Sequence, residues 1–306
     1  MAVVLTASPP RRLTRRRFLQ GSLLGAAGLA LYAGEIERHW IEITRHDVGL
    51  RGLASAFDGM RIAQISDIHM EDFTEPAFLR HAVKLVNREK PDAVFMTGDF
   101  VTALLALRPA TLRFDRSTIN DCAEILAGLE CKSLYAVLGN HDHGVGAHLV
   151  STALRTAGIT VLRNTSVAIE RGSSRFWLAG VDDPLTAHPQ PDLAIPEFIR
   201  NQPNEPVILL CHGPDYADNL LAMPAGQAVD FMLSGHSHGG QVRLPFYGAC
   251  VLPPLGKKYV EGFFNFGRLQ LYVNRGLGTI GLPFRFDCPP EISIFTLRPA
   301  ATAQLS

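Results

Sequence analysis

The chain has 306 residues, and its 29 Lys and Arg are matched by 29 Asp and Glu, so no excess of positive charge indicates nucleic acid as a partner. Hydrophobic residues make up 47% and charged residues 19%, which excludes an intrinsically disordered chain. The five cysteines lie far apart and form no CxxC pair, which excludes a disulfide framework and a zinc ribbon.

Residues 1–36 are predicted to be an export signal or anchor rather than part of the folded domain. The run from Thr14 to Gln20 (TRRRFLQ) resembles the twin-arginine export signal, and a charge-free run rich in Gly, Ala and Leu follows it. This run is shorter than the ~20 apolar residues that span a bilayer, and no good A-x-A cleavage site follows. We expect the twin-arginine export machinery to carry the protein out of the cytoplasm, with the segment retained as a membrane anchor if it is not cleaved. The alternative is a basic leader before a buried helix.

From about residue 37 to residue 306 the sequence predicts one α/β domain, because apolar strand patterns alternate with helical ones. Thr74 and Pro76 predict the start of a helix that runs to about residue 90, and Gly158 ends a second helix that begins near residue 147. Residues 101–116 are expected to form an irregular loop over the site. Strands are expected at residues 61–66, 93–97, 133–138, 207–210 and 229–233, with shorter or closing strands at 160–162, 167–169, 176–179, 269–274 and 292–297.

Five short polar motifs each come directly after one of the five main strands. Because ligands gather at the carboxyl ends of parallel strands, we expect these motifs to meet at one edge of the domain. Their carboxylates, amide and imidazoles form a ligand set that suits divalent Mn, Fe or Zn. The motifs are Asp67-Ile68-His69, Gly98-Asp99, Gly139-Asn140-His141-Asp142, Cys211-His212-Gly213 and Gly235-His236-Ser237-His238.

The motifs differ in how much each indicates alone. About one chance Asp-x-His is expected in a chain of this length, and a lone histidine such as His212 is more often a hydrogen-bonded core residue than a ligand. Gly-Asn-His-Asp and Gly-His-Ser-His are each expected by chance on the order of once in several hundred such chains. All five in this order, each behind a strand, favour a metal site over a purely structural explanation.

This order of motifs resembles that of the calcineurin-like metallophosphoesterase superfamily, D-x-H, G-D-x-x-D, G-N-H-[DE], H and G-H-x-H, over residues 61–297. The runs GHSHGGQVRLP (235–245), NRGLG (274–278) and CPPEI (288–292) are similar to a branch of exported or membrane-associated phosphodiesterases. That branch includes relatives of UDP-diacylglucosamine pyrophosphohydrolases. The resemblance implies a four-layer α/β/β/α sandwich, in which two sheets face each other and helices cover the outside.

The resemblance also implies two adjacent divalent ions, Mn, Fe or Zn, that share one carboxylate. A bridging carboxylate is also what physical reasoning requires, because it offsets the repulsion between two cations ~3.5–4 Å apart. One ion would be held by Asp67, His69, Asp99 and His238, and the other by Asp99, Asn140, His212 and His236, with Asp99 bridging.

The implied reaction is hydrolysis of a phosphodiester or pyrophosphate by metal-bound hydroxide that attacks phosphorus in line. His141 would donate a proton or a hydrogen bond to the leaving oxygen, the alternative being a structural role. The chain departs from the family where the second Asp of G-D-x-x-D is replaced by Thr102. That Asp usually orients the catalytic histidine, and Asp142 is a candidate substitute, although adjacent side chains often point in different directions.

Asn140 and Arg275 are the residues that we expect to contact the substrate. Arg275 could bind a phosphate through its planar guanidinium, and a structural ion pair is an equal alternative. If the protein is exported, a lipid-linked or envelope phosphodiester is favoured over a lipid-sugar pyrophosphate on the cytoplasmic side. Two rival functions remain open, namely a phosphomonoesterase or nucleotidase of the same fold and a metal-stabilised binding protein without catalysis.

Overall fold

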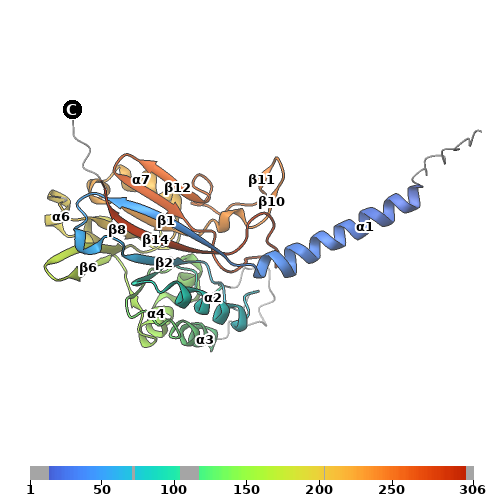
Figure 1. Cartoon of the computed structure of the whole chain (residues 1–306), viewed down its shortest axis with the longest axis horizontal. Helices are drawn as coiled ribbons and strands as arrows, with labels where there is room; N and C mark the ends of the chain where they lie inside the picture. The colour runs from blue at the N-terminus through green and yellow to red at the C-terminus, as the bar shows by residue number, and fades with distance from the viewer. Residues whose placement is uncertain (1–13, 71–72, 104–116, 203, 301–306) are drawn as a thin grey trace, which may run out of the picture.

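A computed structural model describes residues 14–70, 73–103, 117–202 and 204–300 of the chain, and two six-stranded sheets dominate it (Figure 1). In the first sheet, β2 to β5 run parallel, β14 is antiparallel to β2, and β1 is parallel to β14. Its strands, in spatial order, are β1 (Glu42–Leu50), β14 (Glu291–Pro299), β2 (Arg61–Ile65), β3 (Ala93–Met96), β4 (Leu134–Ala136) and β5 (Thr160–Val161).

The second sheet has a parallel centre of four strands and one antiparallel strand at each edge. A separate two-stranded hairpin, β10 (Arg243–Leu244) and β11 (Gly248–Ala249), lies near the inner end of α1 in Figure 1. The strands of the second sheet, in spatial order, are β12 (Gly262–Phe266), β13 (Leu269–Val273), β9 (Phe231–Ser234), β8 (Val207–Leu210), β7 (Ser174–Gly180) and β6 (Thr165–Arg171).

Helices cover the outer face of each sheet, which confirms the predicted four-layer α/β/β/α sandwich (Figure 1). The first sheet is covered by α2 (Pro76–Glu89), α3 (Ser117–Leu126) and α4 (Asn140–Thr156), and the second by α5 (Pro191–Ala194), α6 (Glu197–Asn201) and α7 (Ala217–Leu221). Short 3₁₀ turns are η2 (Glu37–His39), η3 (Ser55–Phe57), η4 (Pro214–Tyr216), η5 (Pro224–Ala228) and η6 (His238–Gly240).

Alternation along the strands explains the three hydrophobic cores between these layers. In β2, Ile62 faces the core between the two sheets, whereas its neighbour Ala63 faces the core under α2, α3 and α4. In β8, Ile208 faces the core between the sheets and Leu209 faces the core of the second helical layer. Strands buried on both faces have continuous apolar sequences, which is why they could be recognised from the sequence.

The structure corrects several predicted boundaries. The N-cap of α2 is Glu75 rather than Thr74, and α4 begins at Asn140 rather than near residue 147, with a kink where Gly146 has φ 135°. Strands β1 and β12 and helix α3 were not predicted. Both strands lie at sheet edges and are largely half-exposed, so they lack the apolar run that marks a central strand. Of the predicted loop 101–116, residues 104–116 lie outside the described residues.

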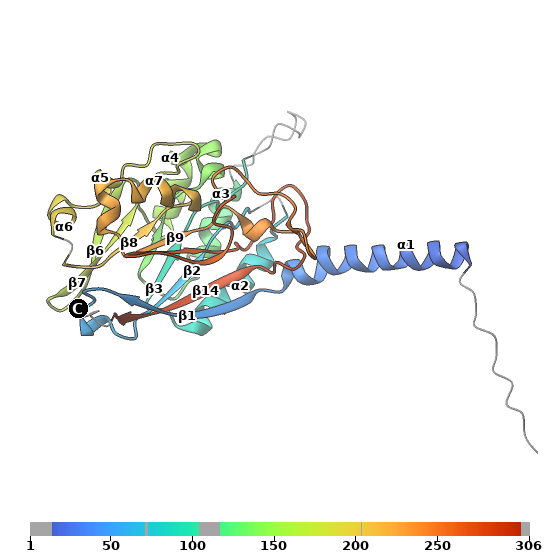
Figure 2. The same cartoon turned by 90° about the horizontal axis from the view of Figure 1, so that it is seen from above.

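The predicted signal or anchor segment contains a helix, α1 (Arg15–Leu31), that projects from the body and buries none of its residues (Figures 1 and 2). The Thr14 hydroxyl accepts a hydrogen bond from the Arg17 N–H, 3.3 Å, and caps the helix at the twin-arginine motif. One π-helical turn, η1 (Tyr32–Ile36), continues α1 onto the body, where Ala33 is buried and its carbonyl accepts from the Arg285 N–H, 3.0 Å.

No helix among the described residues has both the length and the apolar character that crossing a membrane requires.

Candidate metal centre

Loops from both sheets bring the predicted ligands to one place. The loops after β2, β3 and β4 of the first sheet and after β8 and β9 of the second carry these residues. Among the described residues, the side chains that could hold a metal fall into three overlapping groups. These groups are Asp67, His69 and His238; His69, Asp99 and His141; and Asp99, His212 and His236.

The first group combines two residues of the loop after β2 with His238, which follows β9. His69 Nε2 and His238 Nε2 are 3.1 Å apart, and His238 Nε2 is 3.4 Å from Asp67 Oδ1. All three side chains are buried, and the two imidazole rings stack with their centroids 4.9 Å apart. Three potential ligand atoms therefore surround one point in the protein.

The third group, Asp99, His212 and His236, contains a carboxylate oxygen that also faces His69 of the first group. His212 Nε2 lies 3.1 Å from Asp99 Oδ2 and 3.2 Å from His236 Nδ1. The same Asp99 Oδ2 is 3.6 Å from His69 Nε2 of the first group. One oxygen atom thus faces both sets of imidazoles, which is the position that a bridging ligand requires.

These distances fit two metal ions. Two ligand atoms that each lie about 2.0–2.1 Å from a tetrahedral ion are about 3.3 Å apart, close to the spacing between these nitrogens and oxygens. Asn140 Oδ1 is buried and has no hydrogen-bond partner among the described residues, although buried polar atoms are nearly always paired. This unpaired oxygen is the atom through which Asn140 could contact a cation, as the sequence predicts.

Backbone carbonyls orient two of the histidines. His212 Nδ1 donates to the Thr97 carbonyl, 2.6 Å, and His236 Nε2 donates to the Pro254 carbonyl, 2.7 Å. Because a carbonyl oxygen can only accept, each ring carries a proton on its outer nitrogen, and its inner nitrogen is the one that can offer a lone pair to a metal. The neutral tautomer that a metal needs is therefore set by main-chain atoms, which sequence motifs do not reveal.

The backbone at the ligands is strained. Asp67, His69, Asp99, His236 and His238 have φ between 49° and 69°, in the left-handed region that residues with a side chain rarely adopt. Each such residue costs on the order of 1 kcal/mol and persists only where the surrounding structure holds it in place. Five strained residues at one centre indicate that the loops are built to aim these side chains.

Asp142 does not replace the missing second Asp of the family motif. Its carboxylate accepts hydrogen bonds from the backbone N–H groups of Asp99, 2.8 Å, Phe100, 2.9 Å, and Gly139, 2.9 Å. It therefore holds the loop of the bridging carboxylate rather than the His141 ring. Asp142 is the third residue after the helix N-cap Gly139, a position from which an acidic side chain commonly accepts from the N-cap backbone N–H. This position was the sequence signal for its role.

His141 and Thr102 also have partners that the sequence did not indicate. His141 Nδ1 accepts from the backbone N–H of Ala103, 3.1 Å, and the Thr102 hydroxyl lies 3.1 Å from His69 Nδ1. Thr102 thus supports a candidate metal ligand instead of the expected catalytic histidine. Since the backbone N–H occupies Nδ1, the neutral His141 ring carries its proton on Nε2.

The electrostatics of the metal-free centre reflect its burial. Burial raises the pKa of Asp67 to about 6 and lowers the pKa of His69 to about 3. Burial opposes ionisation of Asp99, but His212 and its other histidine neighbours hold the pKa of that carboxyl well below its usual range. Burial likewise disfavours a charged His212, yet the Asp99 carboxylate raises the pKa of His212 well above its usual value. A divalent cation would take the place of the proton that His212 and Asp99 share.

Arg275 is engaged by carboxylates. Its guanidinium pairs with Glu42, 2.6 Å, and Glu291, 3.2 Å, and its side chain is largely buried. These contacts agree with the structural ion pair that the sequence analysis gave as the alternative role of Arg275. A contact between Arg275 and a substrate phosphate stays a prediction.

The family model of the calcineurin-like phosphoesterases matches residues 60–240, more than half of the chain. The chain belongs to this family. The phosphoesterase is 36% identical to the metallophosphoesterase YkuE of Bacillus subtilis. The alignment spans 298 residues and covers 94% of this chain and 99% of that protein. It is 34% identical to phosphodiesterase YaeI of Escherichia coli, over 93% of this chain and 99% of that protein.

A third relative is the UDP-2,3-diacylglucosamine pyrophosphatase LpxG of Chlamydia trachomatis, at 27% identity over 86% of this chain and 91% of that protein. Among solved structures, a dimetal phosphatase from Danio rerio aligns with a TM-score of 0.46 at 13% identity, over 75% of this chain and 94% of that one. Family membership and the clustered ligands identify the protein as a metal-dependent phosphoester hydrolase.

Proposed function

We propose that this phosphoesterase hydrolyses a phosphodiester or pyrophosphate at a centre of two divalent ions bridged by Asp99. The observation that carries the proposal is the position of Asp99 Oδ2, 3.1 Å from His212 and 3.6 Å from His69. Phosphodiesterase and pyrophosphatase activities in the names of two relatives support this bond class over a phosphomonoester.

The residues of the chain supply position and charge. Bound divalent ions would lower the pKa of water towards about 7 and offset the charge of the phosphoryl oxygens. Asp67, His69 and His238 would hold one ion, and Asn140, His212 and His236 the other, with Asp99 between them. The left-handed backbone at five of these positions preorganises them, so that little reorganisation accompanies the reaction.

His141 would stabilise the leaving oxygen. Its ring lies edge-on to that of His69, with centroids 4.8 Å apart, so it borders the centre. The Ala103 N–H on Nδ1 leaves Nε2 as the donor. Neutral His141 would therefore donate a hydrogen bond from Nε2, without an acidic partner to stabilise an imidazolium.

The replacement of His141 by Ala tests this function. With Mn²⁺ present and bis-p-nitrophenyl phosphate as substrate, His141→Ala is expected to lower kcat roughly 10²–10⁴-fold while two equivalents of metal stay bound. His148→Ala is the matched control, because His148 is exposed on the same helix α4. Faster turnover of p-nitrophenyl phosphate than of the diester would indicate a phosphomonoesterase. Two bound ions without turnover of any ester would indicate a binding protein.

We also propose that the protein is exported by the twin-arginine route and acts on an envelope or lipid-linked phosphoester. The TRRRFLQ motif at the start of α1 and the complete exposure of that helix support this location. Arg15→Lys combined with Arg16→Lys should keep a reporter fused after Ser306 in the cytoplasm, whereas the unaltered fusion is exported. Arg80→Lys, at an exposed position of α2, is the control. Export of the double variant would contradict the route.

A further inference from the structure

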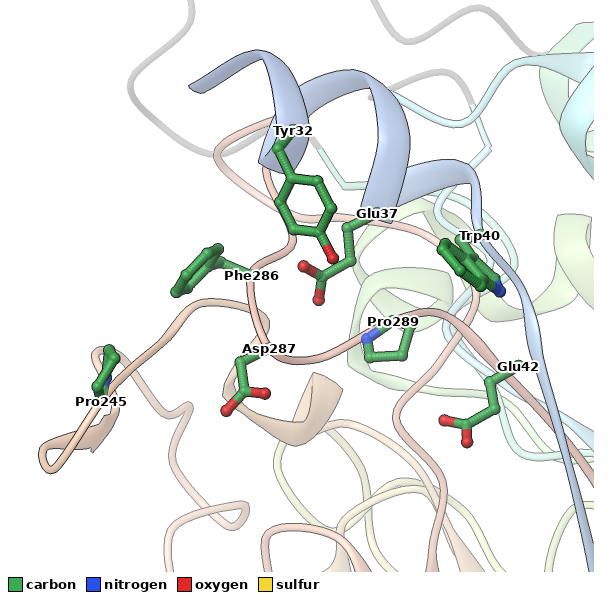
Figure 3. Close-up of a pocket in the computed structure, with 8 residues that line it drawn as sticks. All are labelled: Tyr32, Glu37, Trp40, Glu42, Pro245, Phe286, Asp287 and Pro289. Carbon is green, nitrogen blue, oxygen red and sulfur yellow. The ribbon is translucent and has the colours of Figure 1, made fainter. Parts of the chain in front are cut away.

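A cavity of about 600 Å³ lies where α1 joins the body, and it takes no part in the metal centre (Figure 3). Aromatic rings form much of its wall. Tyr32 and Phe286 meet edge to face, with centroids 6.4 Å apart and ring planes at 84°. Trp40 lies on another side of the same cavity and is 65% exposed. Aromatic faces at a cavity of this size are typical of a site for a small organic group.

Three carboxylates line the same cavity, and two of them have no cationic partner. Glu42 pairs with Arg275, 2.6 Å, whereas Glu37 and Asp287 form no ion pair with any described residue. Glu37 is only 4% exposed; one of its oxygens accepts from the Cys288 N–H, 2.6 Å, and its carboxylate is hydrogen-bonded to the Tyr32 hydroxyl. Asp287 is exposed and Glu37 is hydrogen-bonded, but no ion pair with a described residue balances either charge, so the cavity presents negative charge to a bound group.

A group that contacts both the carboxylates and the aromatic rings of this wall would be cationic and partly apolar. A hydrated inorganic ion would gain little from the rings of Tyr32, Trp40 and Phe286, whereas an alkylammonium group is attracted to aromatic faces and to carboxylates alike. We propose that this cavity binds an organic ammonium group, primary or quaternary, belonging to a free amine or to the headgroup of a phospholipid.

The surroundings of the cavity accommodate either source. Pro245, on the hairpin β10–β11, lines the cavity, and the next residue, Phe246, is fully exposed. Such a side chain beside the cavity could contact the acyl chains of a lipid whose headgroup is bound. Cys288 lies between the cavity and the metal centre, since its N–H donates to Glu37 and its thiol donates to the His238 carbonyl, 3.2 Å. Binding at the cavity is therefore measured directly, by the fluorescence of Trp40, and not through turnover.

Trp40 provides a direct readout, because the chain has only two tryptophans and the other, Trp177, can be replaced by Phe. In full-length Trp177→Phe protein, choline is expected to change Trp40 fluorescence in a saturable way. The neutral carbon isostere 3,3-dimethylbutan-1-ol should bind at least about tenfold more weakly, because it lacks the charge that cation–π and carboxylate contacts require. Equal binding of the two probes, or no saturable change with choline, would overturn the proposal.

Asp287→Asn in the same background should weaken choline binding several-fold with unchanged thermal stability, since an Asn tolerates the left-handed backbone at this position, φ 53°. Asp121→Asn, exposed on α3, is the matched control and should bind choline as the parent does. Equal binding by Asp287→Asn would also overturn the proposal.

An experiment with vesicles distinguishes a lipid headgroup from a soluble amine as the ligand. If the protein binds phosphatidylcholine vesicles but not phosphatidylglycerol vesicles, and choline competes with this binding, the ligand is a lipid headgroup. Binding of choline without binding to vesicles assigns a soluble amine.

Discussion

The two sheets contribute different chemistry to the same centre. Loops after β2, β3 and β4 of the first sheet carry the candidate oxygen ligands together with His69, whereas loops after β8 and β9 of the second carry only candidate imidazole ligands. Their supports differ as well. The loop of Asp99 is held by the Asp142 side chain, while His212 and His236 are held by main-chain carbonyls of Thr97 and Pro254. A point substitution can therefore remove the support of the Asp99 loop, because that support is a side chain. The backbone carbonyls that orient His212 and His236 are kept in any substitution.

The bridging carboxylate is where the two halves meet, and its loss should have the largest effect. Asp99→Asn removes the negative charge that offsets the repulsion between the two ions. We expect fewer than two equivalents of metal and a fall in kcat/KM on the order of 10³-fold, equivalent to about 4 kcal/mol of transition-state stabilisation. Elemental analysis and diesterase kinetics measure both effects. Full metal content in Asp99→Asn protein would show that Asp99 does not bridge.

The anchor of the first half should come next. In Asp142→Asn protein, an amide NH₂ group would face backbone N–H donors that the carboxylate now accepts. Each buried donor left without a partner costs about 1–3 kcal/mol, so we expect a loss of about 3 kcal/mol of unfolding free energy. Denaturant unfolding of metal-free protein measures this loss independently of metal binding. The exposed Asp121→Asn should unfold like the parent, and an equally stable Asp142→Asn protein would remove the proposed anchor role.

The comparison also explains what the sequence could predict. The ligands were recognisable because each follows a doubly buried apolar strand, where polar residues such as Asp67 and His236 stand out. The groups that orient the histidines were not recognisable, because every residue has a backbone carbonyl. Only the fold determines that the carbonyls of Thr97 and Pro254 face His212 and His236. The roles of Thr102 and Ala103 depend on which ring each loop approaches, and that is decided by tertiary packing.

The fold shows the same division. Strand β8 was predicted to the residue and β9 to within two residues, since both faces of each strand are buried. Edge strand β1 was missed, because its alternately exposed sequence, EITRHDVGL, gains its place by pairing with β14, which lies almost 250 residues later in the chain. A strand formed by so distant a partner leaves little signal in its own residues.

A smaller effect should follow from the support of His69. Thr102→Val keeps the shape of the side chain but removes the hydroxyl that lies 3.1 Å from His69 Nδ1. Loss of such an outer contact typically lowers metal affinity 10–100-fold, and we expect the lower end of that range. Competition with a metal chelator measures the affinity. Thr102→Ser, which keeps the hydroxyl, should restore parental affinity, and equal affinity of the Val variant would show that the contact is not used.

The smallest effect concerns protons released when metal binds. Burial raises the pKa of Asp67 from 3.8 to about 6, so the metal-free carboxyl is protonated at pH 5 and ionised at pH 7. Asp99 raises the pKa of His212, so His212 is positively charged at both pH values, whereas His69, with its pKa lowered to about 3, is neutral at both. Because ligands bind metal in their deprotonated forms, binding should release more protons at pH 5, where Asp67 is protonated, than at pH 7. The plot of log affinity against pH should accordingly be steeper below about pH 6 than above it. Titration calorimetry in buffers of different ionisation enthalpy measures the proton number directly, and an equal release at the two pH values would show that Asp67 is not the group that titrates between them.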